Sequence, residues 1–129
     1  ETTSFTPRFD GDGLLPAIVT DEATGEVLMF AFMNRDALER TLSTRQAHFW
    51  SRSRKKIWKK GEESGNVLEI AEIRTDCDQD VLQIKVTPEG HGAACHTGRK
   101  SCFYRKIVNG ELEFIDNEKL FDPDFVYRK

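Results

Sequence analysis

Three aspartates and a cysteine alternate within TDCDQD, residues 75–80, and this spacing could bind two kinds of metal ion. On an extended segment successive side chains point to opposite sides, so the aspartates would project together and Cys77 would point away from them. Carboxylates suit a hard cation such as Mg²⁺, whereas a thiolate suits Zn²⁺. The segment therefore predicts a carboxylate site beside a thiolate ligand. The three aspartates are Asp76, Asp78 and Asp80.

The same acidic pattern also occurs in solvated turns and at the start of calcium loops. A solvated turn is the commoner setting for an isolated D-x-D-x-D. The EF-hand calcium loop fails on position when Asp76 is counted as its first residue. The sixth residue is then Val81 rather than glycine, and the twelfth is Thr87 rather than glutamate. The metal interpretation depends on further ligands elsewhere in the chain.

Two further cysteines, Cys95 and Cys102, enclose the segment HTGRKS and could share a metal ion with Cys77. Free cysteines are often no more than small buried apolar side chains. Three thiolates, however, leave one zinc position open for water, as in catalytic zinc sites. His96, next to Cys95, could be a fourth ligand or a general acid or base near the metal.

Cations and aromatic rings are concentrated in RSRKKIWKK, residues 52–60, which follows Trp50 and contains Trp58. Such a run of charge is usually a solvated face. In a chain of net charge -3, the combination of cations with flat rings favours recognition of phosphates and of a base.

The composition is that of one compact domain, residues 1–129, with 38% hydrophobic and 32% charged residues. The longest apolar run, VLMFAFM, is too short to cross a bilayer, so no membrane association is expected. The net negative charge argues against a general nucleic-acid binder. An odd number of cysteines and an N-terminal segment without an apolar core predict reduced thiols and a cytoplasmic location.

Short strands and one principal helix are predicted from the periodicity of apolar residues. MNRDALERTLSTRQ has helical spacing with Asn34 as N-cap, and Asn109-Gly110 is the strongest hairpin signal. The predicted fold is mainly β or α+β, a compact, barrel-like sheet domain. The expected strands lie in residues 14–20 and 27–33, which would pair as a hairpin across the turn DEATGE, and in residues 47–54, 67–78, 81–86 and 102–115.

Four motifs, in this order, resemble the phosphoribosyl-AMP cyclohydrolase family, which catalyses the third step of histidine biosynthesis. They span most of the chain. The family often has a glycine after the threonine before FWSRSR, where this chain has Arg45 after Thr44, a difference that affects a turn rather than the chemistry. The motifs are MNRDAL at 33–38, FWSRSRKKIWKKGEESGN at 49–66, DCDQD at 76–80 and ACHTGRKSCF at 94–103.

The resemblance implies a zinc-dependent hydrolase that opens the adenine ring of N1-(5-phosphoribosyl)-AMP between N1 and C6. The product would be the phosphoribosyl-formimino-aminoimidazole carboxamide ribonucleotide. It further implies a homodimer whose zinc site combines Cys77 of one chain with two cysteines of the other. The implied zinc ligands are Cys77, Cys95 and Cys102, and the implied Mg²⁺ ligands are Asp76, Asp78 and Asp80.

For that reaction His96 is the expected catalytic residue, transferring protons between the attacking water and the leaving nitrogen. Two substrate phosphates need cationic partners, and a base could pack against Trp50 or Trp58. Mg²⁺ would order the site or meet a phosphate. The candidates for substrate binding are Trp50, Arg52, Arg54, Lys60 and Arg99.

Two alternatives differ in the chemistry that they predict. A zinc-stabilised nucleic-acid-binding module would use the basic segment, hold one zinc tightly and show no dependence on Mg²⁺. A zinc deaminase would attack the same carbon of adenine and release ammonia, but the H-x-E and P-C-x-x-C pattern of those enzymes is missing from the sequence.

Overall fold

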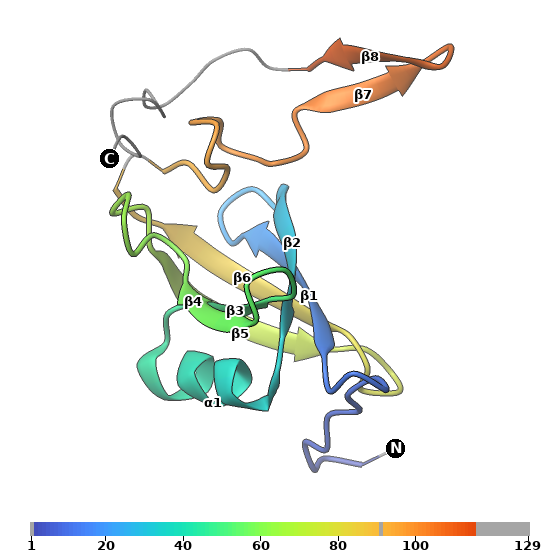
Figure 1. Cartoon of the computed structure of the whole chain (residues 1–129), viewed down its shortest axis with the longest axis vertical. Coiled ribbons are helices and arrows are strands. Elements are labelled where there is room, and N and C mark those ends of the chain that lie inside the picture. The colour runs from blue at the N-terminus through green and yellow to red at the C-terminus, as the bar shows by residue number, and fades with distance from the viewer. Residues whose placement is uncertain (1, 91, 116–129) are drawn as a thin grey trace.

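The computed structural model describes residues 2–90 and 92–115, in which eight strands and one helix are present (Figure 1). Residues 1, 91 and 116–129, which belong to the predicted 1–129 domain, lie outside this description. The elements are β1 (Leu15–Asp21), β2 (Val27–Met33), α1 (Arg35–Thr44), β3 (His48–Ser51), β4 (Lys56–Lys59), β5 (Leu68–Thr75), β6 (Leu82–Pro88), β7 (Arg105–Val108) and β8 (Glu111–Phe114).

Six strands form one sheet in the order β4-β3-β2-β1-β6-β5. The predicted hairpin of β1 and β2 is confirmed, and β5 and β6 form a second antiparallel pair. The two hairpins join through β1 and β6, which pair in parallel although they are far apart in the sequence. This pairing leaves the β5–β6 turn at one end of the sheet and the segment after β6 at the other.

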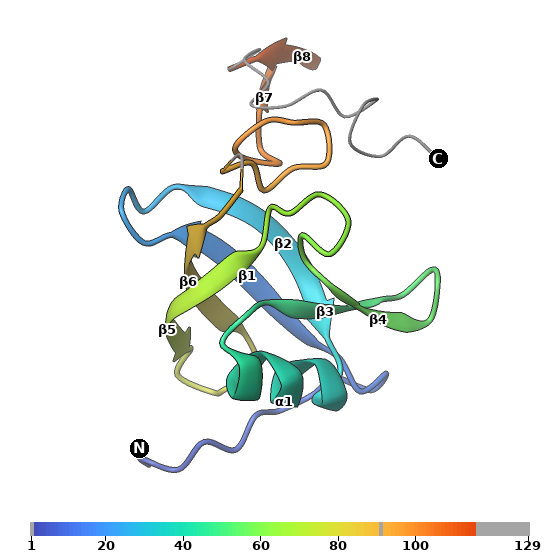
Figure 2. The same ribbon diagram turned by 90° about the vertical axis from the view of Figure 1, so that its left-hand side faces the viewer.

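The sheet curls until its two sides meet (Figure 2). The backbone between α1 and β3 reaches β5, where the Ala47 amide donates to the Leu68 carbonyl at 3.1 Å. The Ile70 amide donates to the Arg45 carbonyl at 2.8 Å. The predicted barrel-like, mainly β fold with one principal helix is therefore confirmed as a curled half-barrel.

The core fills the inside of this curl because apolar side chains alternate along the strands. On β6, for example, Leu82, Ile84 and Val86 are fully buried, whereas Gln83 and Lys85 between them are half-buried. On the other side Phe49 of β3 is also fully buried, with its ring 5.1 Å from that of Trp58. The same alternation places Leu15, Ala17 and Val19 of β1 in the core.

Helix α1 begins and ends as its sequence dictates. The Asn34 side chain accepts a hydrogen bond from the Ala37 amide at 2.9 Å, which confirms it as the N-cap. At the other end Arg45 has a left-handed backbone with φ of 61°, the conformation that glycine adopts most easily. The Arg45 guanidinium donates to the Ile70 carbonyl and so helps to hold this turn against β5.

The basic segment contains a strand that the sequence analysis did not predict. Lys56–Lys59 forms β4, paired antiparallel with β3 through a turn in which Lys55 has φ of 53°. Its cations, Lys56 and Lys59, flank Ile57 and Trp58, both of which pack against the core. The strand was not predicted because the many cations of the segment favour a solvated face over a half-buried strand.

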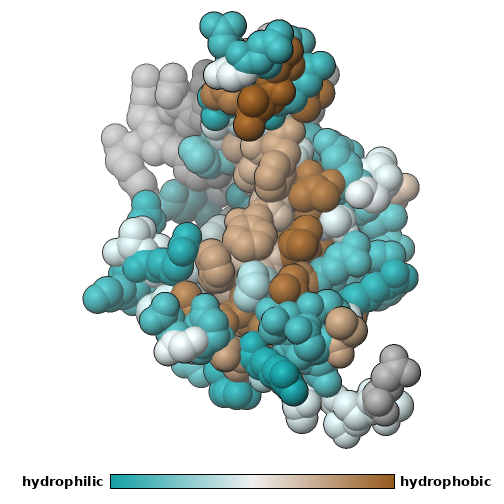
Figure 3. Space-filling model, turned by 90° about the vertical axis from the view of Figure 1, so that its right-hand side faces the viewer, coloured by the Kyte–Doolittle hydropathy of each residue, from teal (hydrophilic) through white to brown (hydrophobic). Residues whose placement is uncertain are grey.

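The predicted hairpin at Asn109-Gly110 is confirmed as β7 and β8, which pair with each other and not with the main sheet. Every residue of the two strands is exposed, including the apolar side chains Ile107, Leu112 and Phe114. Figure 3 shows apolar side chains gathered on the hairpin and continuing down one face of the body of the molecule. Within the described residues, no helix is both long and apolar enough to span a membrane.

Candidate functional site

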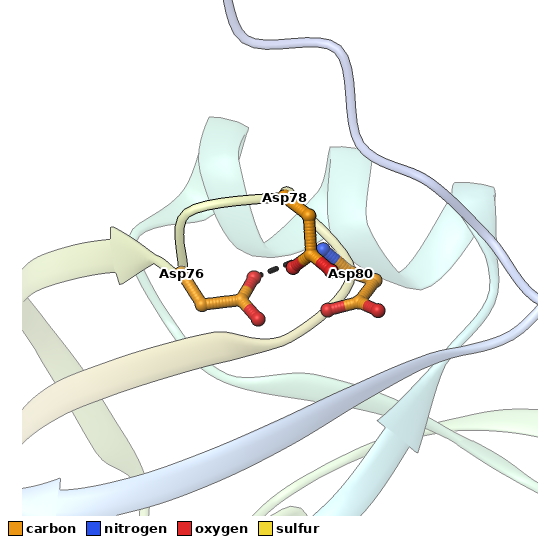
Figure 4. A group of neighbouring side chains, drawn as sticks. All are labelled: Asp76, Asp78 and Asp80. Atoms are coloured by element: carbon orange, nitrogen blue, oxygen red, sulfur yellow. Dashed lines mark hydrogen bonds between the residues drawn. The ribbon is translucent and has the colours of Figure 1, made fainter. Parts of the chain in front are cut away.

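The acidic segment is a tight turn between β5 and β6 rather than an extended strand end. The Asp76 carboxylate accepts hydrogen bonds from the amides of Asp80 at 3.0 Å and Val81 at 3.1 Å. This wraps the chain around Asp76, and Figure 4 shows the three carboxylates turned toward one another. The predicted convergence of Asp76, Asp78 and Asp80 is thus present, but the strand alternation proposed as its cause is wrong.

The three carboxylates form a plausible site for a hard cation. One oxygen from each lies within 4.8 Å of the others, and all three side chains are exposed. A hydrogen bond with Asp76, a second with Asp78 and the proximity of both charges raise the pKa of Asp80 to about 6. This repulsion would be relieved by a divalent cation, and an all-oxygen donor set suits Mg²⁺ better than zinc.

At the opposite end of the sheet, Cys95 and Cys102 lie together in a compact loop after β6. The loop is closed by the Cys95 amide, which donates to the Arg99 carbonyl at 3.1 Å, and by the Gly98 amide, which donates to Cys95. It is anchored to β2 through the Cys102 amide, which donates to the Leu28 carbonyl at 2.7 Å.

The two thiols are electrostatically unlike each other. The pKa of Cys95 is lowered to about 5, chiefly because its sulfur accepts a hydrogen bond from the Cys102 thiol. Burial raises this pKa, and hydrogen bonds from Thr97 lower it further. The same hydrogen bond raises the pKa of Cys102, the thiol that donates it. The Thr97 hydroxyl donates to the Cys95 sulfur at 3.0 Å. The pair is thus prepared to carry one thiolate, the form that binds zinc.

Lys60 is buried beside this pair, which its place in the basic segment did not suggest. Lys60 is only 8% exposed. This burial lowers the pKa of its ammonium group, whereas negative charge on Cys102 and Cys95 raises that pKa. A cation at this place offsets the charge of thiolates in a poorly solvated environment.

Cys77, the third predicted zinc ligand, does not join the pair within one chain. It lies exposed in the acidic turn before β6, whereas Cys95 and Cys102 follow that strand (Figure 1 and Figure 2). A strand of seven residues spans about 20 Å, which no single ion can bridge. Among the described residues, accordingly, the three cysteines form no common metal-binding group.

His96 is exposed and follows Cys95 directly, so its imidazole is available at the surface near the thiol pair. His48, which the sequence left without a functional role, is buried in β3, and its Nδ1 lies 2.8 Å from the Gln46 carbonyl oxygen. Of these two histidines, His96 is therefore the one whose ring is accessible to a molecule at the surface.

The other predicted substrate-binding residues are spread over the surface around β3, β4 and the cysteine loop. Trp50 is half-buried on β3, and the Arg52 guanidinium lies 4.2 Å from the centre of the Phe32 ring. Arg54 is exposed in the β3–β4 turn. Arg99 stacks on Tyr104, 4.1 Å from its ring centre, and so connects the cysteine loop to the hairpin.

Sequence reasoning missed Lys100, which fastens the cysteine loop to the β1–β2 turn. Its ammonium lies 2.9 Å from Asp21 and 3.2 Å from Glu26, and the Asp21 side chain is only 9% exposed. Next to it the Ser101 hydroxyl donates to the Val27 carbonyl at 2.7 Å. No local pattern signals these contacts, because the partners are more than seventy residues apart in the chain.

Several known proteins are similar in sequence to this chain over almost its whole length. A family model described as phosphoribosyl-AMP cyclohydrolase matches residues 29–104. The phosphoribosyl-AMP cyclohydrolase of Rhizobium etli (strain CIAT 652) is 57% identical over 97% of this chain and 86% of its own length. That of Rhizobium leguminosarum bv. trifolii (strain WSM2304) is 58% identical over the same shares. That of Bradyrhizobium sp. (strain BTAi1) is 52% identical over 98% of this chain and 99% of its own.

The Asp21–Lys100 ion pair predicts a pH-dependent stability. Burial pushes the pKa of Asp21 upward, but hydrogen bonds from Lys100 and the Ala23 amide outweigh it, so the folded-state pKa is below its ordinary value. The stabilisation is therefore present above about pH 4 and is lost as the pH falls through the folded-state value. Lys100→Met should lower the free energy of unfolding by about 1 kcal/mol at neutral pH and by less in acid, measured by urea denaturation.

The matched control is Lys106→Met, because Lys106 pairs with Glu113 at 3.6 Å and both side chains are more than half exposed. That change should have little effect at either pH. A Lys100→Met effect that is equally large in acid and at neutral pH would show that the lost interaction is not the ion pair with Asp21.

Proposed function

The chain belongs to the phosphoribosyl-AMP cyclohydrolase family and is an enzyme of that type, and we propose that it is a zinc-dependent hydrolase of histidine biosynthesis. The proposed reaction opens the adenine ring of N1-(5-phosphoribosyl)-AMP between N1 and C6. Its product is the phosphoribosyl-formimino-aminoimidazole carboxamide ribonucleotide. The observation that carries the proposal is the paired Cys95 and Cys102, beside buried Lys60 and next to His96.

Zinc would be held by Cys95 and Cys102 of one subunit and Cys77 of the other. Two observations support a shared site. The thiol pair and Cys77 lie at opposite ends of β6, so one chain cannot surround the ion. Cys77 is also exposed, as a ligand offered to a second chain must be.

The β7–β8 hairpin supports a homodimer independently. An isolated two-stranded hairpin is marginally stable in water, and this one makes no strand pairing with the main sheet. Its apolar side chains are nevertheless exposed, Ile107 at 79%, Leu112 at 58% and Phe114 at 50%. A second copy of the chain would bury this surface, and Arg99 stacked on Tyr104 links that contact to the cysteine loop.

The chemical step follows from the charge of the substrate. A ribosyl group on N1 leaves the adenine ring positively charged, which makes C6 electrophilic. Water adds to C6, the C6–N1 bond breaks, and the electron pair of that bond takes a proton at N1. Bound zinc would supply the nucleophile at neutral pH by lowering the pKa of water. His96 would take a proton from that water and deliver one to N1.

The remaining residues would bind and orient the nucleotide. Exposed Arg52 and Arg54 are free to reach phosphates, and Trp50 offers a half-buried ring to a base. Lys60 is buried beside the thiols, so it would meet only a substrate group that enters the zinc site. Mg²⁺ would bind Asp76, Asp78 and Asp80 at the other end of the sheet, next to the Cys77 that the partner uses. The proposal places the enzyme in the cytoplasm, with a small-molecule nucleotide as its substrate.

Adding phosphoribosyl-AMP to the purified protein tests the reaction directly. We expect an absorbance change from ring opening, its loss when a zinc chelator is added, and its return with Zn²⁺. Cys95→Ser should lower zinc content and abolish the absorbance change. Ring opening at the normal rate in zinc-free Cys95→Ser protein would remove zinc from the mechanism, and release of ammonia would identify a deaminase.

Mixing two inactive variants tests the shared site. In a heterodimer of Cys77→Ala with Cys102→Ala, one site loses both residues and the other keeps all three. Random mixing makes half of the dimers mixed, so about a quarter of wild-type activity and zinc should return after refolding the two chains together. Activity that stays absent although mixed dimers form would contradict a site built from two subunits.

His96→Ala tests the proton transfers. Zinc content should change little, because the thiolates stay, while kcat should fall about 10²- to 10⁴-fold. His48→Gln, which alters a buried imidazole on the same sheet, is the control and should act on stability instead. A kcat unchanged in His96→Ala would leave His96 without a role in proton transfer, and a loss of zinc would make it a ligand.

A further inference from the structure

The residues before β1 cross the acidic turn and are fastened to one of its residues, Gln79. The Gln79 side chain accepts a hydrogen bond from the Thr6 amide at 2.8 Å and donates one to the Ser4 carbonyl at 3.2 Å. Its own carbonyl accepts from the Arg8 amide at 2.7 Å. Residues 4–8, here called the N-terminal arm, thus have three hydrogen bonds to Gln79 alone.

Gln79 also has the unusual backbone conformation on which the shape of the turn depends. It lies between Asp78 and Asp80, and its φ is 60°, in the left-handed region that residues with a Cβ seldom adopt. Its amide donates to the Asp76 carbonyl at 3.2 Å. Because Asp78 and Asp80 flank it, the conformation of Gln79 determines whether their two carboxylates face one point.

The arm and the turn enclose a cavity of about 490 Å³. Asp76, Cys77 and Asp78 line it from the turn, and Arg8 lines it from the arm. The arm is therefore one wall of the space beside the carboxylates, and Gln79 is the residue that holds this wall in place.

We propose that Gln79 is a positioning residue for the Mg²⁺ ligands, because it clamps the N-terminal arm across the acidic turn and thereby couples the order of the arm to cation binding. The proposal rests on the proposed function, since it takes the acidic turn as the Mg²⁺ site. Gln79 itself does not bind the cation. It fixes the directions of Asp78 and Asp80, and the arm holds Gln79.

Such coupling must act in both directions. If the bound arm raises the affinity of the carboxylates for Mg²⁺, then Mg²⁺ must stabilise the hydrogen bonds of the arm by the same factor. Loss of the Gln79 side chain should consequently weaken Mg²⁺ binding and remove the effect of Mg²⁺ on the arm together.

Gln79→Gly removes the side-chain hydrogen bonds of residue 79 and leaves its left-handed backbone conformation in place. Glycine adopts the left-handed conformation without strain but cannot bond to Thr6 and Ser4. Gln79→Asn is a second variant, because asparagine tolerates this conformation and keeps an amide that is one methylene too short. The matched control is Gln83→Ala, since the Gln83 amide on β6 contacts Thr20 at 3.4 Å, away from the turn.

The test uses the zinc-loaded full-length protein with Mg²⁺ as the only ligand, titrated calorimetrically and followed by amide hydrogen exchange. In the wild type and in Gln83→Ala, Mg²⁺ should slow exchange at the amides of Thr6 and Arg8. In Gln79→Gly and Gln79→Asn we expect roughly fivefold weaker Mg²⁺ binding, fast exchange at the Thr6 amide with or without Mg²⁺, and unchanged zinc content.

Equal Mg²⁺ affinity in the wild type and Gln79→Gly, with the arm released, would overturn the coupling while leaving the proposed Mg²⁺ site intact. A wild-type protein that binds no Mg²⁺ would instead overturn the proposed Mg²⁺ site, and the role of Gln79 with it.

Discussion

The span of β6 is the constraint on which the rest of the structure depends. Its seven residues separate Cys77 from Cys95 and Cys102 by about 20 Å, so the three thiols cannot meet within one chain. The strand is also fixed inside the sheet, paired with both β1 and β5, and it carries three buried core side chains. It cannot shorten or bend to bring the thiols together, and a zinc site with all three therefore requires a second chain.

Each end of the sheet carries its own group of side chains, and each group is positioned by different contacts. At one end the Asp76 carboxylate organises the acidic turn through backbone amides, and Gln79 joins that turn to the N-terminal arm. At the other end the Cys102 amide and Lys100 fasten the cysteine loop to the β1–β2 hairpin. The cysteine loop is thus held against the sheet, whereas the acidic turn is held by its own amides and by the arm, so both groups of side chains are positioned before any ion would bind.

Local patterns predicted most of the fold and the convergence of the three aspartates, but they did not predict contacts between distant segments. Alternating apolar residues and the Asn109-Gly110 turn were sufficient for the two hairpins, and Asn34 was sufficient for the start of α1. β4 was missed because its cations concealed half-buried Ile57 and Trp58. The acidic turn, the burial of Lys60 and the Lys100–Asp21 pair depend on tertiary packing, which no short window of sequence encodes.

Native mass spectrometry of the zinc-loaded protein over a dilution series tests the shared site most directly, because it reports zinc and oligomeric state on the same particles. A site divided between subunits predicts two zinc ions on each dimer and none held by the monomers that appear on dilution. Monomers that keep one zinc each, with affinity equal to that of the dimer, would contradict it, because a single chain would then hold the complete site.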